Sequence, residues 1–268
     1  MKHINSLLPI LTLPLALILS IVVPLTAWAN DNDDEELEFE EAELFFELND
    51  TDGDLGIHAL IDGEPWKRLE IEDPRERRML NIYVQGRLRR QGLTEIFFES
   101  AEPTFDELPP EKFFRRFREG TYEIEGKTLD GVELESETEL THVMPAPPVV
   151  SVNGQPAAEN CDADELPIVG GGDVVTLSWD PVTQSHPDLG TRGVAVEVVN
   201  YEVVAEIDET PFRTSTILPP EVNSFQVPPE LLALNDEIKF EILVREESYN
   251  QTAVESCFCI EECPEEEE

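Results

Sequence analysis

The sequence has little positive charge, few histidines and one long apolar run. Eighteen lysines and arginines stand against 59 aspartates and glutamates, which gives a formal net charge of −41. Nucleic acids and anionic membranes would be repelled by a surface of this charge, so we exclude them as partners. Cations, basic proteins and neutral glycans stay open. The acidity is also typical of a protein that stays soluble in a salty medium, where salt screens the repulsion between its own charges.

Recognisable catalytic motifs are missing as well. None of the four histidines lies in an H-E-x-x-H pattern or beside a serine or cysteine in a nucleophile motif. We interpret His58, His142 and His186 as surface or strand residues. Carboxylates are so abundant here that a glycosidase-like pair cannot be recognised from the sequence. The sequence therefore predicts a protein that is not an enzyme.

The long apolar run lies at the N-terminus. Lys2 and His3 precede an apolar stretch from Leu7 to Leu25, which is followed by Ala27-Trp28-Ala29. A charged start, an apolar centre and an A-x-A site predict a cleaved signal peptide, residues 1–29. At roughly 20 residues the run is also long enough for an uncleaved anchor, which is the alternative. We expect a secreted, periplasmic or cell-surface protein whose mature form does not span the membrane.

Composition divides the rest of the chain. Prolines stiffen a linker and cannot donate to a sheet, so the Pro-rich residues 145–148 predict a boundary between two domains, 44–144 and 149–258. Residues 30–43 are mostly acidic, with too few apolar groups to offset the entropy of ordering, and we expect a disordered leader. Residues 259–268 form a tail rich in cysteine and glutamate.

The first domain is predicted to be a β-sandwich. Its short apolar segments are separated by turn residues such as Asp62-Gly63 and Asp130-Gly131, the latter typical of a tight hairpin. Pro109–Phe117 predicts one short helix, because proline stands at its start and three phenylalanines share a face. The predicted strands are Leu44–Leu48, Ile57–Ile61, Leu69–Ile71, Leu80–Val84, Glu95–Phe98, Thr121–Ile124 and Leu134–Leu140.

The second domain has its apolar segments in a recognisable order. Val174–Val182 contains Trp179, and Val196–Ile207 contains Tyr201. Three more segments follow, namely Ser224–Pro228, Ile238–Val244 and Asn250–Ser256. Over about residues 149–258 this order resembles a fibronectin type III domain, which is an immunoglobulin-like β-sandwich. The resemblance implies that Trp179, Tyr201 and Phe240 lie in the core between two sheets.

The resemblance has one departure with structural consequences. The family's tyrosine near the start of the sixth strand is replaced by Ile238 or Phe240, so we expect Leu232 and Leu234 to close that corner by packing. The family implies a role in interaction or spacing, and from the fold alone no chemistry. The whole chain is thus predicted to be all-β, with two β-sandwich domains in tandem and one short helix in the first.

An acidic loop is the candidate metal site. Asp50, Asp52 and Asp54 present carboxylates at alternate positions, an arrangement in which several oxygens can converge on calcium. The loop is not an EF-hand, because Leu55 and Ile61 replace the glycine and the bidentate glutamate. The alternative is an acidic turn between two strands. Calcium is the one cofactor that the sequence suggests.

Four cysteines in an exported chain favour two disulfides, with three possible connectivities. The cysteines are Cys161, Cys257, Cys259 and Cys263. Pairing Cys161 with Cys257 or Cys259 would join the two ends of the second domain, and closing so long a loop contributes about 4 kcal/mol. A zinc site is the alternative, although the Cys-x-Cys-x3-Cys spacing is not the usual one.

Basic and aromatic residues of the first domain complete the candidates. Six arginines form a predicted basic patch: Arg87, Arg89, Arg90, Arg115, Arg116 and Arg118. They either neutralise nearby glutamates, at roughly 0 to 1 kcal/mol per pair, or dock an acidic segment such as the chain's own leader or glutamate tail. Trp66 and Tyr83, if exposed, would form a platform on which a glycan stacks.

These features predict an exported, non-enzymatic binding or structural protein whose partner is a protein or glycan surface. One alternative is a glycan-binding or glycan-processing accessory protein. Another is an adhesion module that depends weakly on calcium.

Overall fold

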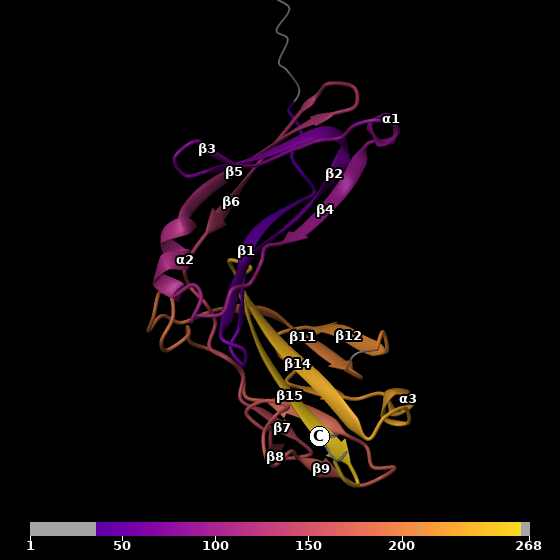
Figure 1. Ribbon diagram of the computed structural model, residues 1–268. Helices are drawn as coiled ribbons and strands as arrows, with labels where there is room; N and C mark the ends of the chain where they lie inside the picture. Colours follow the sequence, from indigo (N-terminus) through magenta and orange to yellow (C-terminus); the bar gives the residue numbers. More distant parts are fainter. Residues whose placement is uncertain (1–35, 209, 264–268) are drawn as a thin grey trace, which may run out of the picture. The chain divides into compact units, whose positions relative to one another are not determined.

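The computed structural model describes residues 36–208 and 210–263, and strands make up most of them (Figure 1). The predicted signal peptide, residues 30–35 and residues 264–268 lie outside this part of the chain. The chain is all-β, as predicted, with three short helices rather than one. Among the described residues, no helix combines the length and apolar character needed to cross a bilayer.

Six strands form the N-terminal sandwich, and one of them belongs to both of its layers. Residues 54–62 of β2 pair with β1, and residues 58–62 also pair with β4. Residues 68–73 pair instead with β3 and β5, Trp66 pairs with both β4 and β5, and β6 pairs with β5. The strands are β1 (Glu41–Asn49), β2 (Asp54–Asp73), β3 (Arg77–Tyr83), β4 (Leu93–Glu99), β5 (Gly120–Thr128) and β6 (Glu133–Leu140).

The predicted turn at Asp62-Gly63 is wrong, because β2 runs through it as one strand of 20 residues. The register of β2 against β4 shifts between Asp62 and Trp66, and beyond this point β2 pairs with β3 and β5. Gly63 lets another chain segment approach, since a Cβ there would lie 3.1 Å from Cδ1 of Phe39. The Asp-Gly pair therefore permits close packing where a turn was expected.

The predicted disordered leader is wrong from Leu37 onwards. The Leu37 N–H donates to the Glu133 carbonyl, and the Leu37 carbonyl accepts from the Glu135 N–H. Phe39 is 6% exposed and packs in the first core. Backbone partners on β6 and one buried aromatic ring offset the ordering cost that the acidic composition implied.

The first core lies between the two halves of β2 and under a helix. It contains Trp66, Leu69 and Tyr122, each no more than 1% exposed. The predicted helix is confirmed as α2 (Pro110–Arg116), whose Phe113 and Phe114 are buried. The hairpin between β5 and β6 is also confirmed, and Gly131 at its tip has a φ of +96°. A second helix, α1 (Leu88–Gln91), was not predicted.

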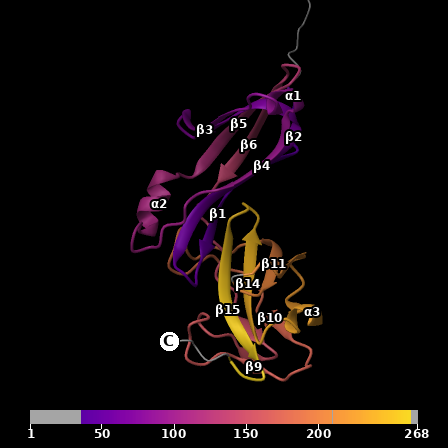
Figure 2. The same cartoon turned by 45° about the vertical axis from the view of Figure 1, so that its right-hand side comes forward.

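The C-terminal strands have the order of a fibronectin type III sandwich. One layer is β13-β10-β7-β8, and the other contains β12-β11-β14-β15. Figure 2 shows β14 and β15 side by side with β11 next to them. The strands are β7 (Val150–Val152), β8 (Gln155–Pro156), β9 (Ile168–Val169), β10 (Thr176–Trp179), β11 (Val198–Glu206), β12 (Arg213–Leu218), β13 (Ser224–Gln226), β14 (Glu237–Glu246) and β15 (Gln251–Ile260).

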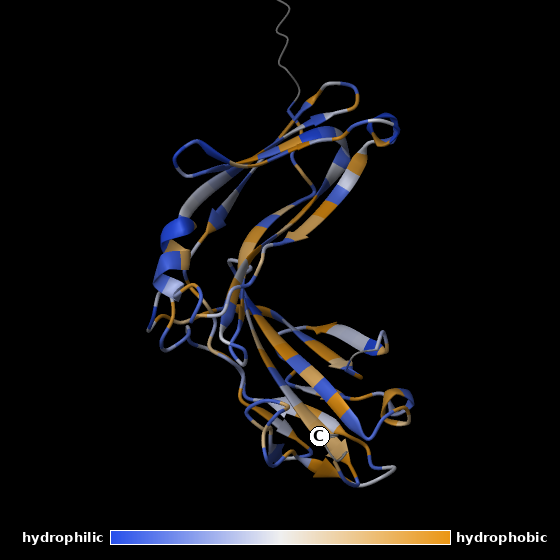
Figure 3. Cartoon of the chain, in the orientation of Figure 1, coloured by the Kyte–Doolittle hydropathy of each residue, from blue (hydrophilic) through white to orange (hydrophobic). Residues whose placement is uncertain are grey.

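The three core residues implied by the resemblance are buried. Trp179 is 3%, Tyr201 1% and Phe240 0% exposed, and the Trp179 and Tyr201 rings lie 5.3 Å apart. The Tyr201 hydroxyl accepts from the Val182 N–H at 3.0 Å. Alternating apolar and polar residues along β14 place one face against this core, which Figure 3 shows as bands of orange and blue.

The corner before β14 is closed by only part of the predicted packing. A short helix, α3 (Pro229–Leu232), precedes the strand, and Leu231 is buried there while Leu232 packs partly buried against the core. Leu234 is 59% exposed, so its predicted role is wrong. The helix directs the Leu231 side chain into the core. It ends at Leu232, and Leu234 follows it outside the core.

A parallel strand pair joins the two sandwiches. Glu47, Leu48 and Asn49 at the end of β1 pair with residues 251–253 at the start of β15. The sheet that contains β14 and β15 therefore continues directly into β1 and β2. The turn before β15 fixes this arrangement through buried Asn250, whose Oδ1 accepts from the Phe46 N–H at 2.8 Å and whose Nδ2 donates to the Val143 carbonyl at 2.9 Å.

The Pro-rich residues 145–148 follow Met144, the last buried residue of the first core, although Leu189 from further along the chain also packs against that core. They are held in place, because the Pro145 carbonyl accepts from Thr252 Oγ1 at 2.8 Å and the Ala146 N–H donates to the Gln184 carbonyl at 3.0 Å. The predicted domain limits of 44–144 and 149–258 stay predictions.

Candidate binding groove

One face of the joined sheet carries side chains from both sandwiches. Side chains alternate between the two faces of a strand, so every second residue of β1, β2, β4, β11 and β14 reaches this face. The side chains line a cavity of about 470 Å³. Its five glutamates are Glu43, Glu47, Glu99, Glu202 and Glu241. We call this cavity the carboxylate groove.

Two arginines offset part of this charge. Arg245 donates from Nη2 to Glu43 Oε2 at 2.5 Å, and its guanidinium lies 4.6 Å from the centre of the Phe45 ring. Arg213 lines the groove as well. With five glutamates and two arginines, the groove keeps an excess of negative charge before its histidine is counted.

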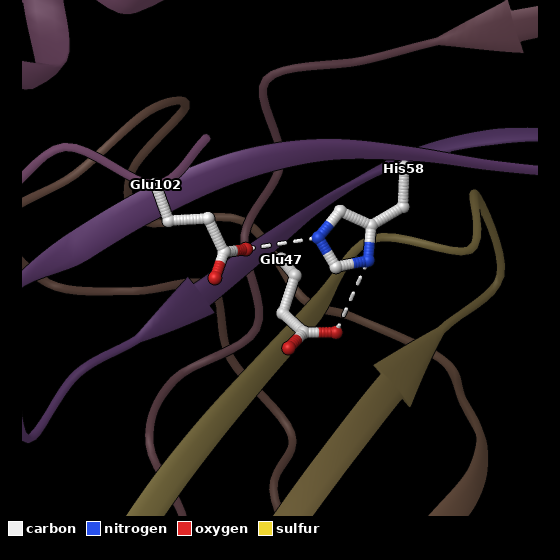
Figure 4. A group of neighbouring side chains, drawn as sticks. All are labelled: Glu47, His58 and Glu102. Carbon is white, nitrogen blue, oxygen red and sulfur yellow. Dashed lines mark hydrogen bonds and ion pairs between the residues drawn. The ribbon is translucent and has the colours of Figure 1, made fainter. Parts of the chain in front are cut away.

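His58 lies in the groove between two glutamates (Figure 4). Its Nε2 is 2.9 Å from Glu102 Oε1, and its Nδ1 is 3.5 Å from Glu47 Oε2. The imidazole is 3% exposed. Gly56 gives Glu102 room to approach, because a Cβ on that glycine would lie 2.3 Å from Glu102 Oε1.

The three side chains offer the ligands of a metal site. One ligand atom from each of Glu47, His58 and Glu102 lies within 4.8 Å of the others, and no second such group occurs in the part of the chain that the structure describes. Nitrogen and carboxylate oxygen are ligands that zinc accepts. The three side chains also satisfy one another without a metal, because the two imidazole nitrogens each contact one of the carboxylates.

The carboxylates around this triad are crowded. Burial, together with the nearby charges of Glu255 and Glu47, raises the pKa of Glu241 to about 8. Burial also raises the pKa of Glu47, against the opposing effects of His58 and the Gln251 hydrogen bond. Burial and the charges of Glu102 and Asp52 raise the pKa of Asp54 to about 6. At neutral pH, Glu241 therefore retains its proton, because burial and the nearby carboxylates disfavour its ionised form.

Sheet register brings two of these acids face to face. Glu241 on β14 is the direct partner of Glu255 on β15, and like charges at such positions destabilise a sheet. Glu255 has partners of its own, with Lys239 Nζ at 2.6 Å and Asn49 Nδ2 at 3.1 Å. Among the described residues Glu241 has no such partner within 4.0 Å. Burial and the nearby charge of Glu255 therefore raise the pKa of Glu241.

The predicted calcium loop is the turn between β1 and β2, as the alternative interpretation proposed. Asp50 Oδ1 lies 2.9 Å from His186 Nε2, and Asp52 Oδ2 accepts from Asn49 Nδ2 at 3.3 Å. Asp54 begins β2 and is influenced by the groove carboxylates. The three aspartates therefore have different neighbours, and calcium binding stays a prediction.

The four cysteines form two disulfides. Cys161 is bonded to Cys257, and Cys259 to Cys263. The first bond joins the segment before β9 to β15, as one of the predicted connectivities had it. The zinc alternative is wrong, because all four sulfurs are taken up in these bonds.

The predicted basic patch is divided between two places. Arg89 and Arg90 belong to α1 and Arg87 caps it, whereas Arg115 and Arg116 belong to α2 and Arg118 follows it. Figures 1 and 2 show the two helices apart. Arg89 lines one cavity and Arg115 another, so the six arginines do not form one surface.

The predicted aromatic platform is half wrong. Trp66 is fully buried, and its Nε1 donates to the Thr94 carbonyl at 3.2 Å. Tyr83 is 60% exposed. The interpretation of His186 as a surface or strand residue is wrong, because it is 5% exposed and lies outside the strands. His58 does lie in a strand, β2.

No model of a known protein family matches the chain, and no curated protein matches it. Among solved structures, the human OSCAR ligand-binding domain is 13% identical, covers 83% of this chain and 100% of its own, and has a TM-score of 0.27. A segment of two fibronectin type III domains from chicken tenascin is 9% identical, with 82% and 98% covered and a TM-score of 0.28.

A bacterial ice-binding adhesin is 10% identical, with 82% of this chain and 64% of that chain covered and a TM-score of 0.25. TM-scores and identities this low carry no argument about function. The fibronectin type III-like fold rests on the strand order of this chain itself.

Sequence reasoning missed the groove residues Glu47, His58, Glu102 and Glu241. The alternation Glu43-x-Phe45-x-Glu47 in β1 was available as a signal that acids share one face of a strand. The position of Glu241 beside them had no local signal, because about two hundred residues separate β1 from β14.

Proposed function

We propose that this chain is an exported, non-enzymatic binding module and that the carboxylate groove holds a basic segment of a partner protein. The observation that carries the proposal is the crowding of carboxylates, four half-buried and Glu99 exposed, on one sheet face shared by both sandwiches. A lysine or arginine side chain in the groove would supply the positive charge that these carboxylates lack.

The energetics favour a cationic ligand. Glu241 faces Glu255 across the sheet and retains its proton to about pH 8. A cation within about 4 to 6 Å favours the ionised form of a carboxylate. A bound cation would thus favour the ionised form of Glu241, and binding below pH 8 would release a proton from it.

Aromatic side chains beside the acids fit the same ligand. Phe45 and Phe97 both line the groove, and Phe97 is 54% exposed. Lysine and arginine have long apolar stems that pack on such rings while their charged ends reach a carboxylate. Arg245 already shows this geometry, since it lies over Phe45 and bonds to Glu43.

The wider role rests on the sequence. The signal peptide pattern and the two disulfides support export to an oxidising compartment. The fibronectin type III-like fold supports interaction or spacing. The alternatives of a glycan-processing accessory and of a calcium-dependent adhesion module have less support from the groove, whose charge calls for a basic partner.

Fluorescence anisotropy with a labelled peptide of alternating lysine and alanine tests the proposal. The double variant Glu99→Gln/Glu202→Gln should bind this peptide about tenfold more weakly than the wild type, at roughly 0.7 kcal/mol per charge. The matched control is Glu135→Gln/Glu137→Gln, which removes the same charge from exposed positions of β6. Equal affinities of the two double variants would contradict the proposal, and so would absence of binding to the wild type.

A further inference from the structure

A second cavity, of about 510 Å³, is lined by basic residues in place of acids. Its charged lining residues are Lys67, Arg68, Arg89 and Lys127, and no aspartate or glutamate lines it. The whole sequence has 59 acidic and 18 basic residues. A cavity lined by four cations and no acid is therefore the opposite of what the composition of the chain predicts.

The sheet register builds this cavity. Tyr83 on β3 is the direct partner of Arg68 on β2, and Arg68 is the direct partner of Lys127 on β5. The three side chains thus form a row across three strands. The register of β2 against β5 shifts between Trp66 and Arg68, and such a bulge breaks the alternation of side chains. Lys67 and Arg68 can therefore both line the cavity.

Two of the four cations have no acidic partner. Among the described residues, neither Lys67 nor Arg89 has a carboxylate oxygen within 4.0 Å, although Lys67 Nζ donates to the Leu129 carbonyl at 3.2 Å. Arg68 bonds to Glu70, and Lys127 bonds to Glu133. The cavity therefore keeps positive charge that the protein itself does not neutralise.

Tyr83 adds a flat apolar surface to these charges. Its side chain is 60% exposed, and the Arg68 guanidinium lies 5.7 Å from the centre of its ring. The apolar face of a sugar ring fits the face of a tyrosine ring, and the hydroxyl group of tyrosine can hydrogen-bond at the same time. A volume of about 510 Å³ is within the range of pockets for small ligands.

We propose that this cavity binds an anionic glycan. One sugar ring stacks on Tyr83, and a carboxylate or sulfate group of the glycan is held by Lys67 and Arg89, with Arg68 and Lys127 beside them. The site is distinct from the carboxylate groove, and the inference does not rest on the function proposed for that groove.

Isothermal titration calorimetry of the full mature chain tests the inference with four probes. An oligogalacturonate carries carboxylates, a heparin oligosaccharide adds sulfates, maltohexaose is neutral, and deca-glutamate is an acidic peptide. We expect at least one of the two anionic glycans to bind and neither maltohexaose nor deca-glutamate to match it. Binding of the oligogalacturonate identifies carboxylate as sufficient, and binding of heparin alone identifies sulfate as the recognised group.

Variants separate this site from general attraction between charges. Lys67→Gln/Arg89→Gln should weaken glycan binding at least tenfold, and Tyr83→Ala should weaken it about fivefold while Tyr83→Phe retains it. Arg115→Gln/Arg116→Gln removes the same charge from exposed positions on α2 and should leave binding unchanged. The inference is overturned if neither anionic glycan binds, if the two double variants behave alike, or if deca-glutamate binds as tightly and is insensitive to Tyr83→Ala.

Discussion

Replacing Glu241 with glutamine should change how the stability of the protein depends on pH. Glu241 lies on β14 opposite Glu255, and burial and the neighbouring carboxylates raise its pKa from 4.5 to about 8. The unfolded chain loses this proton near pH 4.5, whereas the folded chain keeps it to about pH 8. Between these values the folded state binds more protons, so the free energy of unfolding falls as pH rises.

The size of the effect follows from this interval. Each pH unit corresponds to about 1.4 kcal/mol, so the interval from pH 4.5 to about 8 gives roughly 5 kcal/mol as an upper bound. Glu241 is only half-buried at the surface of the groove, and solvent screening reduces this figure. We expect about 3 kcal/mol. Glutamine keeps the shape of the side chain and does not titrate, so the variant should lose this part of the pH dependence.

Urea unfolding followed by tryptophan fluorescence, with the disulfides intact, measures the effect at pH 5, 6.5 and 8. Wild type and Glu241→Gln should have similar stability at pH 5, and the variant should be more stable by about 3 kcal/mol at pH 8. Glu137→Gln, an exposed change on β6, should follow the wild type throughout. Parallel curves for wild type and Glu241→Gln would refute the reasoning, since they would mean that Glu241 ionises alike in both states.

Two further predictions concern the junction and the disulfides. Asn250→Ala should lower the free energy of unfolding by about 2 to 4 kcal/mol in a urea titration, because it leaves the buried Phe46 N–H without its acceptor; a loss below about 1 kcal/mol would contradict this. Cys161→Ser/Cys257→Ser opens a loop with a sequence separation of 96 residues and should cost about 4 kcal/mol, whereas Cys259→Ser/Cys263→Ser, with a separation of 4, should cost about 2 kcal/mol by the same measurement. Equal losses in the two pairs would show that loop length does not set their contribution.

The second sandwich could be predicted because its pattern is local. Alternation along β11 and β14 and the buried pair Trp179 and Tyr201 identify strands and core without knowledge of distant contacts. The first sandwich was predicted in its strands and in α2, but not in its connections. Asp62-Gly63 has the composition of a tight turn, yet Gly63 serves to admit Phe39. An Asp-Gly pair has two physical uses, and only the packing partner distinguishes them.

Burial of single polar or aromatic residues was harder to predict than strands. Trp66 was expected at the surface and lies in the core, because the bend in β2 turns it between two sheet layers. His58 and His186 are buried because each has a carboxylate within hydrogen-bonding distance, Glu102 and Asp50. In a chain with 59 acids, such partners are too numerous to assign from sequence. Composition determines that a buried histidine finds a partner, and the fold determines which one.

The carboxylate groove depends on a contact that no local pattern encodes. Only three residue pairs join β1 to β15, and they place Glu47 on the same sheet face as Glu241. Without that parallel pair the two sandwiches would each expose an ordinary acidic strand, as strands of acidic proteins do. With it, carboxylates about two hundred residues apart in sequence become neighbours on one sheet face, where the two sandwiches join. A ligand that relieves the repulsion must then touch both sandwiches, so binding in the groove should also strengthen the junction.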